Sequence, residues 1–567
     1  MWTKDIYNYQ RRETQMVRIG ELTMGADAPI RIQSMANCNT NDTTACAQQA
    51  ARIIDAGGEL VRFTAQGTRE ATNLQFIRTE LNELGAKYAH TPLVADIHFM
   101  PAAADEAALH VEKVRINPGN YVDKARVFKH IDYTDEEYAA ELQRIRERFL
   151  PFLQLCKQHH TAIRIGVNHG SLSDRIMSRY GDTPEGMVES CMEFLRICVQ
   201  EDFPHVVISI KASNTVVMIT TVRLLVQKMK DENMAFPLHL GVTEAGDGED
   251  GRIKSAVGIG ALLADGIGDT IRVSLSEAPE AEIPVAKALV QYIQTRQNHA
   301  PITSAPWQPH PLTKSLSRVG GGQLPIVIGQ SATYGQLRPD YIETPQAIID
   351  ADGNILPVMR LDCENVMQAL EAKDLVLLLT THHANPVGDY RSAIMQLRSH
   401  GCMLPVVACV HSQANSLTDM QLQVAADMGV LLIDGLLDGL YISHPTIQPN
   451  ACVETAFGIL QAARVRTSKT EYISCPSCGR TLFDLEKTLA QIKSKTSHLK
   501  GLKIGVMGCI VNGPGEMADA DYGYVGAGRG KVSLYKQKQC IEKNIPEEEA
   551  VDKLIELIRL NGDWQDS

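Results

Sequence analysis

The sequence has no long apolar run, no excess of basic residues and no cysteine spacing typical of a disulfide framework. Nothing in it approaches the roughly 18 apolar residues of a membrane-spanning helix, so a transmembrane helix is excluded. Lys and Arg total 55 against 67 Asp and Glu, and the net charge of −12 is unfavourable for a general nucleic-acid binder. Residues 1–20 lack the apolar core of a signal peptide. Most of the 13 cysteines stand alone in apolar stretches, which indicates a reducing cytoplasm.

A strand–loop–helix unit recurs eight times in the first half of the chain. The strand segments are IRIQSM (30–35), LVRFT (60–64), LVADIH (93–98), KVRIN (113–117), AIRIGVN (162–168), VVISIKAS (206–213), LHLGVTE (238–244) and TIRVSLS (270–276). The segments between them carry apolar residues at helical spacing. Apolar strands that alternate with helices predict a parallel sheet buried on both faces. Eight units in about 250 residues favour a closed (β/α)₈ barrel over an open doubly wound sheet.

The rest of the chain divides into two further domains, as expected for 567 residues. Residues 297–311 contain four prolines and indicate a linker. A second α/β region follows, with strand segments LPIVIG (324–329), LVLLLTT (375–381), LPVVACV (404–410) and GVLLIDG (429–435), none of which contains Arg or Lys. The predicted organisation is an α/β protein with a TIM barrel in 1–296, an inserted α/β domain in 297–465 and a C-terminal α+β domain in 466–567.

Five barrel strands hold a cation within an apolar run, near the end where barrels place their chemistry. These cations are Arg62, Arg115, Arg164, Lys211 and Arg272. A buried cation is costly unless it is paired, and the nearby carboxylates Asp96 and Glu244 cannot neutralise all five. The pattern predicts a polyanionic substrate carrying two phosphates, which Arg binds in a bidentate fork. A layer of structural salt bridges inside the barrel is the alternative.

Further polar residues gather at the same strand ends, among them His98, Asn117, Asn168 and Ser274. After the seventh strand, the loop GVTEAGDGEDGRIKSA leads into a helix that we expect to begin near Arg252. Its glycines permit a nest of backbone N–H groups, and loops after strands seven and eight are the usual phosphate position in barrels. The loop is therefore a candidate phosphate site, although such loops also serve as simple turns.

The C-terminal segment contains candidate metal ligands. Cys475 and Cys478 form a C-x-x-C pair in ISCPSCGRTLFD, and Cys509 follows 31 residues later in MGCIVNGPGE. Three thiolates suit an iron–sulfur cluster or zinc. Glu516 is one candidate for a fourth ligand, and Cys540 is the other, in a four-cysteine zinc site. Because a C-x-x-C pair can also be a simple redox dithiol, the residues alone leave three alternatives.

Nine motifs, in sequence order across both end domains, resemble one enzyme family. They are IQSM (32–35), VRF (61–63), ADIHF (95–99), KVRINPGN (113–120), IRIGVNHGSL (163–172), SIKASN (209–214), GVTEAG (241–246), CPSCGR (475–480) and MGCIVNGPGE (507–516). The chain resembles the 4-hydroxy-3-methylbut-2-enyl diphosphate synthases, also called 1-hydroxy-2-methyl-2-(E)-butenyl 4-diphosphate synthases, of the non-mevalonate isoprenoid pathway. Its length fits the family's three-domain form, in which an extra domain separates the barrel from the cluster domain.

The resemblance implies an oxidoreductase that opens the ring of 2-C-methyl-D-erythritol 2,4-cyclodiphosphate, with two electrons and protons entering and the linear allylic diphosphate and water leaving. It implies a [4Fe–4S] cluster on Cys475, Cys478, Cys509 and Glu516, of which Glu516 is expected to yield its iron to the substrate. The implied substrate residues are Arg62, Asp96, His98, Arg115, Asn117, Arg164, Asn168, Lys211, Arg272 and Ser274. Glu244 resembles the family's acidic residue near the substrate carbons and is expected to donate a proton.

The resemblance also implies reduced ferredoxin or flavodoxin as electron donor, with neither a nucleic acid nor a membrane as partner. Lys493, Lys495, Lys500 and Lys503 fit either a solvated helix face or a docking surface for such an acidic donor. In two-domain members a dimer partner supplies the cluster. The middle domain here would let the cluster domain close on the barrel of its own chain, about a hinge near 466–472. A homodimer is the alternative arrangement. The alternative function is a phosphate-binding barrel enzyme with a structural zinc domain.

Overall fold

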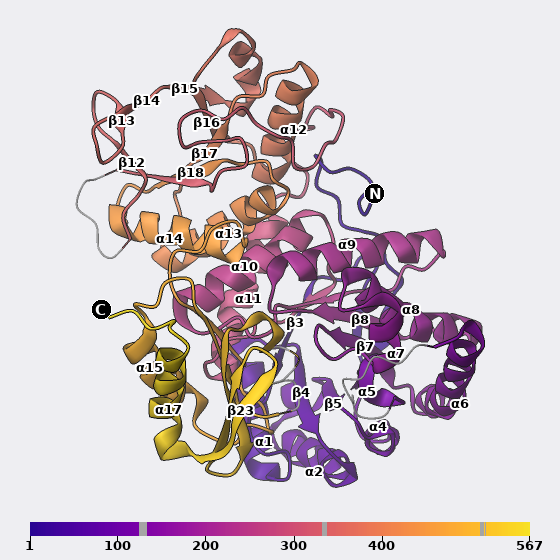
Figure 1. The fold of residues 1–567 in the computed structure, drawn as a ribbon. Coiled ribbons are helices and arrows are strands. Elements are labelled where there is room, and N and C mark those ends of the chain that lie inside the picture. Colours follow the sequence, from indigo (N-terminus) through magenta and orange to yellow (C-terminus); the bar gives the residue numbers. More distant parts are fainter. Residues whose placement is uncertain (124–132, 331–336, 511–514, 516, 567) are drawn as a thin grey trace.

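A computed structural model describes residues 1–123, 133–330, 337–510, 515 and 517–566. Figure 1 shows an indigo-to-magenta barrel, a salmon-to-orange α/β body above it and a yellow mixed body beside it. No helix among the described residues is long and apolar enough to cross a membrane. The predicted fold class is confirmed.

Eight parallel strands close the first body into a TIM barrel. They are β3 (Arg31–Met35), β4 (Leu60–Ala65), β5 (Leu93–Ile97), β6 (Lys113–Ile116), β7 (Ala162–Asn168), β8 (Val206–Lys211), β9 (His239–Leu240) and β10 (Thr270–Ile271). Their order is β8-β7-β6-β5-β4-β3-β10-β9, and a parallel bridge between Ile208 and Leu238 joins the two ends. Each strand overlaps one predicted segment, because each segment is an apolar run between turn-forming residues.

Helices surround the barrel (Figure 1). They are α1 (Thr43–Ala56), α2 (Thr68–Leu84), α3 (Ala86–Ala89), α4 (Pro101–Ala107), α5 (Pro118–Tyr121), α6 (Asp135–His159), α7 (Asp174–Tyr180), α8 (Pro184–Gln200), α9 (Thr215–Asp231), α10 (Gly248–Ala264), η1 (Pro279–Ala281) and α11 (Glu282–Gln294). A hairpin of β1 (Val17–Ile19) and β2 (Leu22–Met24) packs against the first residues of four strands and covers the amino-terminal end of the barrel. The opposite, carboxyl end is where barrels carry their chemistry.

The middle body contains an eight-stranded, mostly parallel sheet. Its strands are β11 (Ile326–Gly329), β12 (Tyr341–Glu343), β13 (Ile348–Ile349), β14 (Ile355–Leu356), β15 (Val358–Asp362), β16 (Val376–Thr380), β17 (Val406–His411) and β18 (Gly439–Ser443). The order is β14-β13-β12-β11-β18-β17-β16-β15, and β13 runs antiparallel to the two strands beside it, β12 and β14. The helices are η2 (Cys363–Glu371), α12 (Pro386–Ser399), α13 (Leu417–Ile433) and α14 (Pro449–Ala462).

One predicted strand of this body is wrong. Residues 429–435 contain the end of helix α13, and the strand is β18, a few residues later. Helix α13 lies between the middle sheet and barrel helix α10, so most of its surface is buried (Figure 1). A Cβ on Gly429 would come within 2.8 Å of the Val257 side chain of α10, which shows how closely the two helices pack. A short apolar run does not distinguish such a buried helix from a buried strand.

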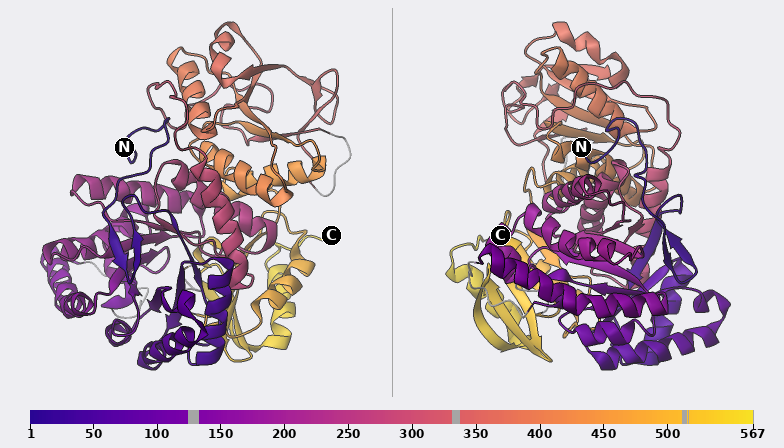
Figure 2. Two further views of the ribbon diagram at one scale, coloured as in Figure 1. Left: turned by 180° about the vertical axis from the view of Figure 1, so that it is seen from behind. Right: turned by 90° about the vertical axis from the view of Figure 1, so that its right-hand side faces the viewer.

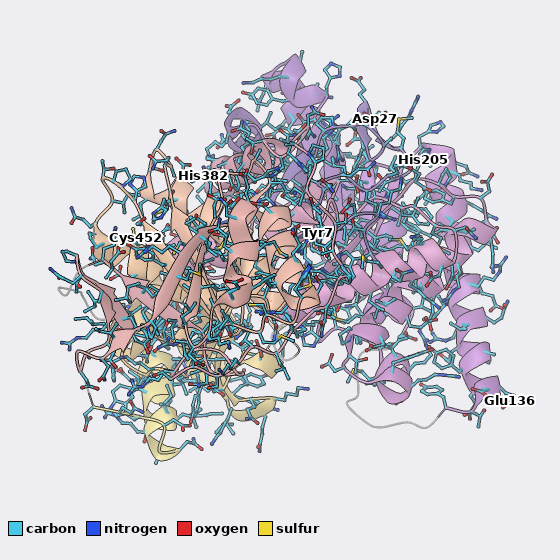
Figure 3. The ribbon with its side chains drawn as sticks, turned by 90° about the horizontal axis from the view of Figure 1, so that it is seen from above. Tyr7, Asp27, Glu136, His205, His382 and Cys452 are labelled. Carbon is cyan, nitrogen blue, oxygen red and sulfur yellow. The ribbon has the colours of Figure 1, made fainter. Side chains whose placement is uncertain are left out.

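Four buried charged side chains join the middle body to the barrel. Arg223 donates to Asp265 at 2.8 Å and to Asp434 at 2.7 Å. Arg391 donates to the same two carboxylates at 2.9 and 2.7 Å. Each of the four is more than nine-tenths buried, so losing one would leave an uncompensated buried charge. Figure 3 places Tyr7, from the N-terminal segment, where these two bodies meet.

A five-stranded mixed sheet forms the C-terminal body, which lies beside the barrel at the carboxyl ends of its strands (Figure 2). Its elements are β19 (Glu471–Ser474), α15 (Leu485–Thr496), β20 (Lys503–Met507), η3 (Met517–Asp519), β21 (Tyr522–Gly528), β22 (Lys531–Lys536), β23 (Gln539–Pro546) and α17 (Glu547–Leu560). Strands β19, β20 and β21 are parallel, and Ser474 pairs with Val506 near the ends of the first two. The cysteines that follow these two strands therefore lie at one edge of the sheet.

Candidate active site

The candidate active site is a cavity between the carboxyl ends of the barrel strands and the C-terminal body. It encloses about 750 Å³, including the space open to solvent. One wall comes from the barrel and consists of Met35, Arg62, Asp96, His98, Arg115, Arg164, Asn168, Lys211, Thr243, Glu244, Arg272 and Ser274. The other wall consists of Cys475, Pro476, Ser477, Cys478, Arg480, Thr481, Met507, Gly508 and Cys509. Both walls belong to one chain.

The cavity brings together all but two of the predicted site residues. Asn117 is buried but does not line the cavity, and its side chain instead accepts the N–H of Gly119 and caps helix α5. Glu516 lies outside the described residues.

Cations outnumber carboxylates around this cavity. The cations are Arg62, Arg115, Arg164, Lys211, Arg272 and Arg480, and the carboxylates beside them are Asp96, Glu244 and Glu282. Among the described residues, Nε and Nη1 of Arg164 have no hydrogen-bond partner. Arg62 donates from Nε and Nη2 to the Met35 sulfur, at 3.0 and 2.7 Å. A polyanion would supply the acceptors that these guanidinium groups need.

Burial and mutual repulsion disfavour the charged forms of these cations. Burial lowers the pKa of Lys211 well below its ordinary value, and repulsion from Arg62 and Arg164 adds to the effect. Burial also lowers the pKa of Arg62 to about 10, although Asp96 opposes the shift. A bound diphosphate would reverse both shifts, because a nearby anion favours the protonated forms.

Asp96 connects the two walls of the cavity. Its Oδ1 accepts from Arg115 at 3.0 Å and its Oδ2 from Arg480 at 2.9 Å. Burial opposes ionisation of Asp96, but Arg62 and Arg115 outweigh it and hold the pKa of this carboxyl well below its ordinary value. Burial, together with Arg115, lowers the pKa of His98 well below its ordinary value, so this imidazole is neutral near pH 7.

A glycine within β7 and a glycine directly after β9 make room for two of the cations. A Cβ on Gly166 would lie 2.4 Å from Nε of Arg115, and one on Gly241 would lie 2.7 Å from Nζ of Lys211. Arg115 also donates to the Gly166 carbonyl at 2.9 Å and to Asn168 at 3.1 Å. The segment IRIGVN therefore both admits the Arg115 side chain and fixes its direction.

Glu244 follows the seventh barrel strand with a φ of 48°, in the left-handed region. Strained non-glycine residues of this kind cluster at functional sites. The residue is 4% exposed, and its Oε2 has no hydrogen-bond partner in the described part of the chain. A buried carboxylate oxygen of this kind is costly in isolation and is available to a substrate or a proton.

Three thiols face the barrel cations across the cavity. Cys475 and Cys509 follow β19 and β20, and Cys478 follows a turn in which Ser477 has a φ of 59°. The N–H of Gly508 donates to Sγ of Cys475 at 3.2 Å. Hydrogen bonds of this type to ligand sulfurs are one means of setting the potential of an iron–sulfur cluster.

The three thiols share one wall of the cavity. No group of three or more His, Cys, Asp or Glu side chains within the described ranges is arranged around one ion. Thiols spread over a wall suit a cluster, because each then binds a different iron. Cys540 lies on β23 opposite Tyr535 and does not line the cavity, so the structure does not support the four-cysteine zinc alternative.

In the loop after the seventh strand, Thr243 and Glu244 line the cavity, whereas the glycine-rich part that follows them does not and instead contacts the C-terminal body. Helix α10 begins at Gly248, earlier than predicted, and the N–H of Gly248 donates to Glu277 at 3.0 Å. Asp247 binds Lys493, one of the four lysines considered for docking. These contacts do not support the predicted phosphate site at this loop, because the Gly248 N–H already binds a barrel carboxylate and Asp247 binds a lysine of the C-terminal body.

Sequence reasoning missed several contributors to the cavity. Glu282 holds Arg272 through two hydrogen bonds, at 2.9 and 3.0 Å, but it lies on α11 and no strand-end pattern indicates it. Met35 and Arg480 lie within IQSM and CPSCGR, so the motifs contained them. A methionine in a strand is ordinarily a core residue, however, and an arginine after a C-x-x-C pair is ordinarily solvated.

The fold and the cavity define a TIM-barrel enzyme with a cationic mouth that faces a thiol-bearing domain. Residues 14–287 match the family model described as the GcpE TIM-barrel domain, and residues 471–560 match that of the GcpE protein C-terminal domain. The chain therefore belongs to the GcpE family. Relatives aligned over nearly the whole chain carry a more specific name.

Those relatives are each named 4-hydroxy-3-methylbut-2-en-1-yl diphosphate synthase (flavodoxin). The protein of Bacteroides fragilis is 58% identical, over 99% of this chain and 98% of its own. That of Akkermansia muciniphila is 43% identical over 99% and 98%, and that of Chlorobaculum tepidum 40% over 99% and 90%. The middle body lies outside both family models but within all three alignments, so these relatives share it. The resemblance drawn from the motifs is confirmed.

Proposed function

We propose that this chain is the oxidoreductase that converts 2-C-methyl-D-erythritol 2,4-cyclodiphosphate to (E)-4-hydroxy-3-methylbut-2-enyl diphosphate in the non-mevalonate isoprenoid pathway. Two electrons and two protons enter, a C–O bond of the ring breaks, and one water leaves. The observation that carries the proposal is the shared cavity. Cations of the barrel and thiols of the C-terminal body face each other across it.

The barrel wall binds the two phosphates. Within the described part of the chain, Arg164, Lys211 and Arg62 form no hydrogen bond with a carboxylate, and they are the groups that gain most from phosphate oxygens. Arg115 and Arg272 are already oriented by Asp96 and Glu282. Such preorganised donors stabilise charge without reorganisation during the reaction.

We infer that Cys475, Cys478 and Cys509 hold a [4Fe–4S] cluster, with Glu516 as the proposed fourth ligand. When bound, such a cluster supplies the electrons that C–O cleavage requires. Glu244 is the proposed proton donor to the departing oxygen or the substrate carbons, which its buried Oε2, unpartnered in the described part of the chain, supports.

Reduced flavodoxin is the proposed electron donor, in line with the names of the relatives. All 13 cysteines lie in the described ranges and are unbridged, which supports a reducing, cytoplasmic location. Because one chain lines both walls, we propose that a homodimer partner need not supply the thiols. Residues 466–472 remain the predicted hinge, about which the C-terminal body would move to admit the substrate to the cavity.

An anaerobic assay tests this function. The iron-loaded protein, the cyclic diphosphate and chemically reduced flavodoxin are mixed, and the product is measured by liquid chromatography and mass spectrometry. We expect the linear diphosphate to form only with all three present. A protein with about four irons per chain that binds the cyclic diphosphate yet releases no linear product would reject the proposal.

A further inference from the structure

Two cysteines outside the active-site machinery lie side by side at the rim of the barrel. Cys38 is in the loop between β3 and α1, and Cys46 is in the first turns of α1. Their sulfur atoms are 2.9 Å apart. Neither residue lines the cavity. Cys38 is partly exposed, whereas Cys46 is completely buried.

The surrounding hydrogen bonds hold both sulfurs in place. The N–H of Cys38 donates to Gln49, one turn further along α1, at 3.2 Å. The thiol of Cys46 donates to the Asn39 carbonyl at 3.3 Å, and Asp42 caps the helix that carries it. A disulfide needs sulfurs about 2.05 Å apart, so the two atoms need to approach by only about 0.9 Å.

The environment assigns different roles to the two thiols. The hydrogen bond with Cys46 lowers the pKa of Cys38, and the same contact raises the pKa of Cys46. The thiolate is the reactive form, and a partly exposed, more acidic thiol beside a buried one is the arrangement of a redox-sensitive pair. Cys38 would meet an oxidant first, and Cys46 would resolve the product.

We propose that Cys38 and Cys46 form a reversible dithiol–disulfide site that is oxidised by hydrogen peroxide. The Cys38 thiolate attacks the peroxide O–O bond, giving the sulfenic acid and hydroxide. The Cys46 sulfur then attacks the oxidised sulfur, the S–S bond forms and water leaves. In total, two thiols lose two electrons and two protons, and one peroxide becomes two waters. Thiol exchange with a dithiol reductant restores the reduced pair.

The pair lies against the loop that carries the cavity thiols. A Cβ on Gly479, between Cys478 and Arg480, would be 2.7 Å from the Cys38 carbonyl oxygen, so the two loops touch. A disulfide would therefore stiffen the barrel loop on which the thiol-bearing segment closes. The site is independent of the proposed function, because it needs neither the substrate nor the cluster.

Peptide mapping tests the proposal directly. Trypsin releases Cys38 and Cys46 on one peptide, residues 32–52, which contains no other cysteine. The anaerobic holoenzyme is treated with stoichiometric hydrogen peroxide, quenched in acid, denatured, alkylated and digested. We expect this peptide to lose the mass of two hydrogens and to take up no alkyl group. Prior treatment with dithiothreitol should restore double alkylation.

Cys540 is the matched internal control. It is also partly exposed and is the only cysteine of its tryptic peptide, residues 539–543. We expect it to stay alkylated in the same sample, and expect Cys46→Ser to abolish the internal disulfide while leaving Cys38 open to sulfenic-acid reagents. The proposal is overturned if peptide 32–52 stays doubly alkylated until Cys540 is also oxidised. It is equally overturned if Cys38 and Cys46 appear only in cross-links to other peptides.

Discussion

The guanidinium group of Arg480, in the C-terminal body, donates to the carboxylate of Asp96, on the barrel, at 2.9 Å. The other oxygen of Asp96 accepts from Arg115, which belongs to the cationic wall. One buried carboxylate therefore holds a cation from each side of the cavity. When the two bodies close, Arg480 joins the cations at the barrel mouth. The contact with Asp96 balances part of the charge that Arg480 brings.

Replacing Arg480 should weaken the closure of the C-terminal body on the barrel without loss of iron. Arg480→Gln removes the charged contact to Asp96 but leaves the three thiols, so we expect turnover to fall at least about tenfold with iron content unchanged. Small-angle scattering should show a larger radius of gyration, and limited proteolysis should cut more readily within 466–472. Unchanged scattering together with unchanged turnover would contradict a role for this contact in closure.

Arg164→Met should weaken substrate binding. Two donors of Arg164 lack partners in the described part of the chain, so this side chain is expected to make charge-assisted hydrogen bonds to phosphate. Losing them should raise KM by about 10- to 100-fold, equivalent to about 1.5–3 kcal/mol. Steady-state kinetics and iron analysis are the measurements. Arg52→Met, at an exposed surface pair, is the control and should match the wild type.

The same Arg164→Met substitution should stabilise the substrate-free protein. Burial lowers the pKa of Arg164 well below its ordinary value, which shows that its charge is disfavoured there. An apolar replacement of similar volume should raise the free energy of unfolding by about 1–4 kcal/mol. Arg175→Met is the matched control: Arg175 is equally buried but binds Glu193 at 2.6 and 2.8 Å, so its loss should destabilise by about 3–5 kcal/mol. Denaturant titration that ranks the two variants in the opposite order would contradict this account.

The sequence predicted the barrel because its strands are short apolar runs, and it predicted the barrel cations because each interrupts such a run near its end. The contacts of Arg480 with Asp96 and of Glu282 with Arg272 depend on how separate elements pack, which no local pattern contains. The end of helix α13 was predicted as a strand because a helix buried on most sides lacks the polar face that identifies an amphipathic helix in a sequence.

The glycine loop shows a second limit of local patterns. Its glycines do adopt left-handed conformations, as Gly246 and Gly248 show with φ of 98° and 57°. The loop also contains Asp247, Glu249 and Asp250, whose charges repel phosphate, and Asp247 and Asp250 bind lysines of the neighbouring body. Weighing charge together with backbone freedom would have favoured a docking role from the sequence alone.

His98 should make the stability of the protein depend on pH. Its folded-state pKa is depressed by burial and by Arg115, whereas in the unfolded chain it titrates near pH 6.5. Below about pH 6.5 the unfolded chain binds a proton that the folded His98 does not, so the free energy of unfolding falls as pH falls. Between pH 6.5 and 5, His98→Gln should reduce this loss by up to about 1.4 kcal/mol per pH unit. Exposed His90→Gln serves as control, and equal pH slopes for wild type and His98→Gln would contradict the prediction.

Paired cysteine substitutions separate the cluster from the zinc alternative. Cys478 lines the cavity beside Cys475 and Cys509, whereas Cys540 lies on β23 outside it. Cys478→Ser should therefore lose most of its iron and its visible absorbance after anaerobic reconstitution, and Cys540→Ser should keep both. Substrate binding to the barrel should survive in each variant, because the phosphate-binding cations are on the opposite wall. A colourless wild type with one zinc per chain, which Cys540→Ser releases, would instead establish the four-cysteine site and leave the barrel as a phosphate-binding enzyme without a reductant.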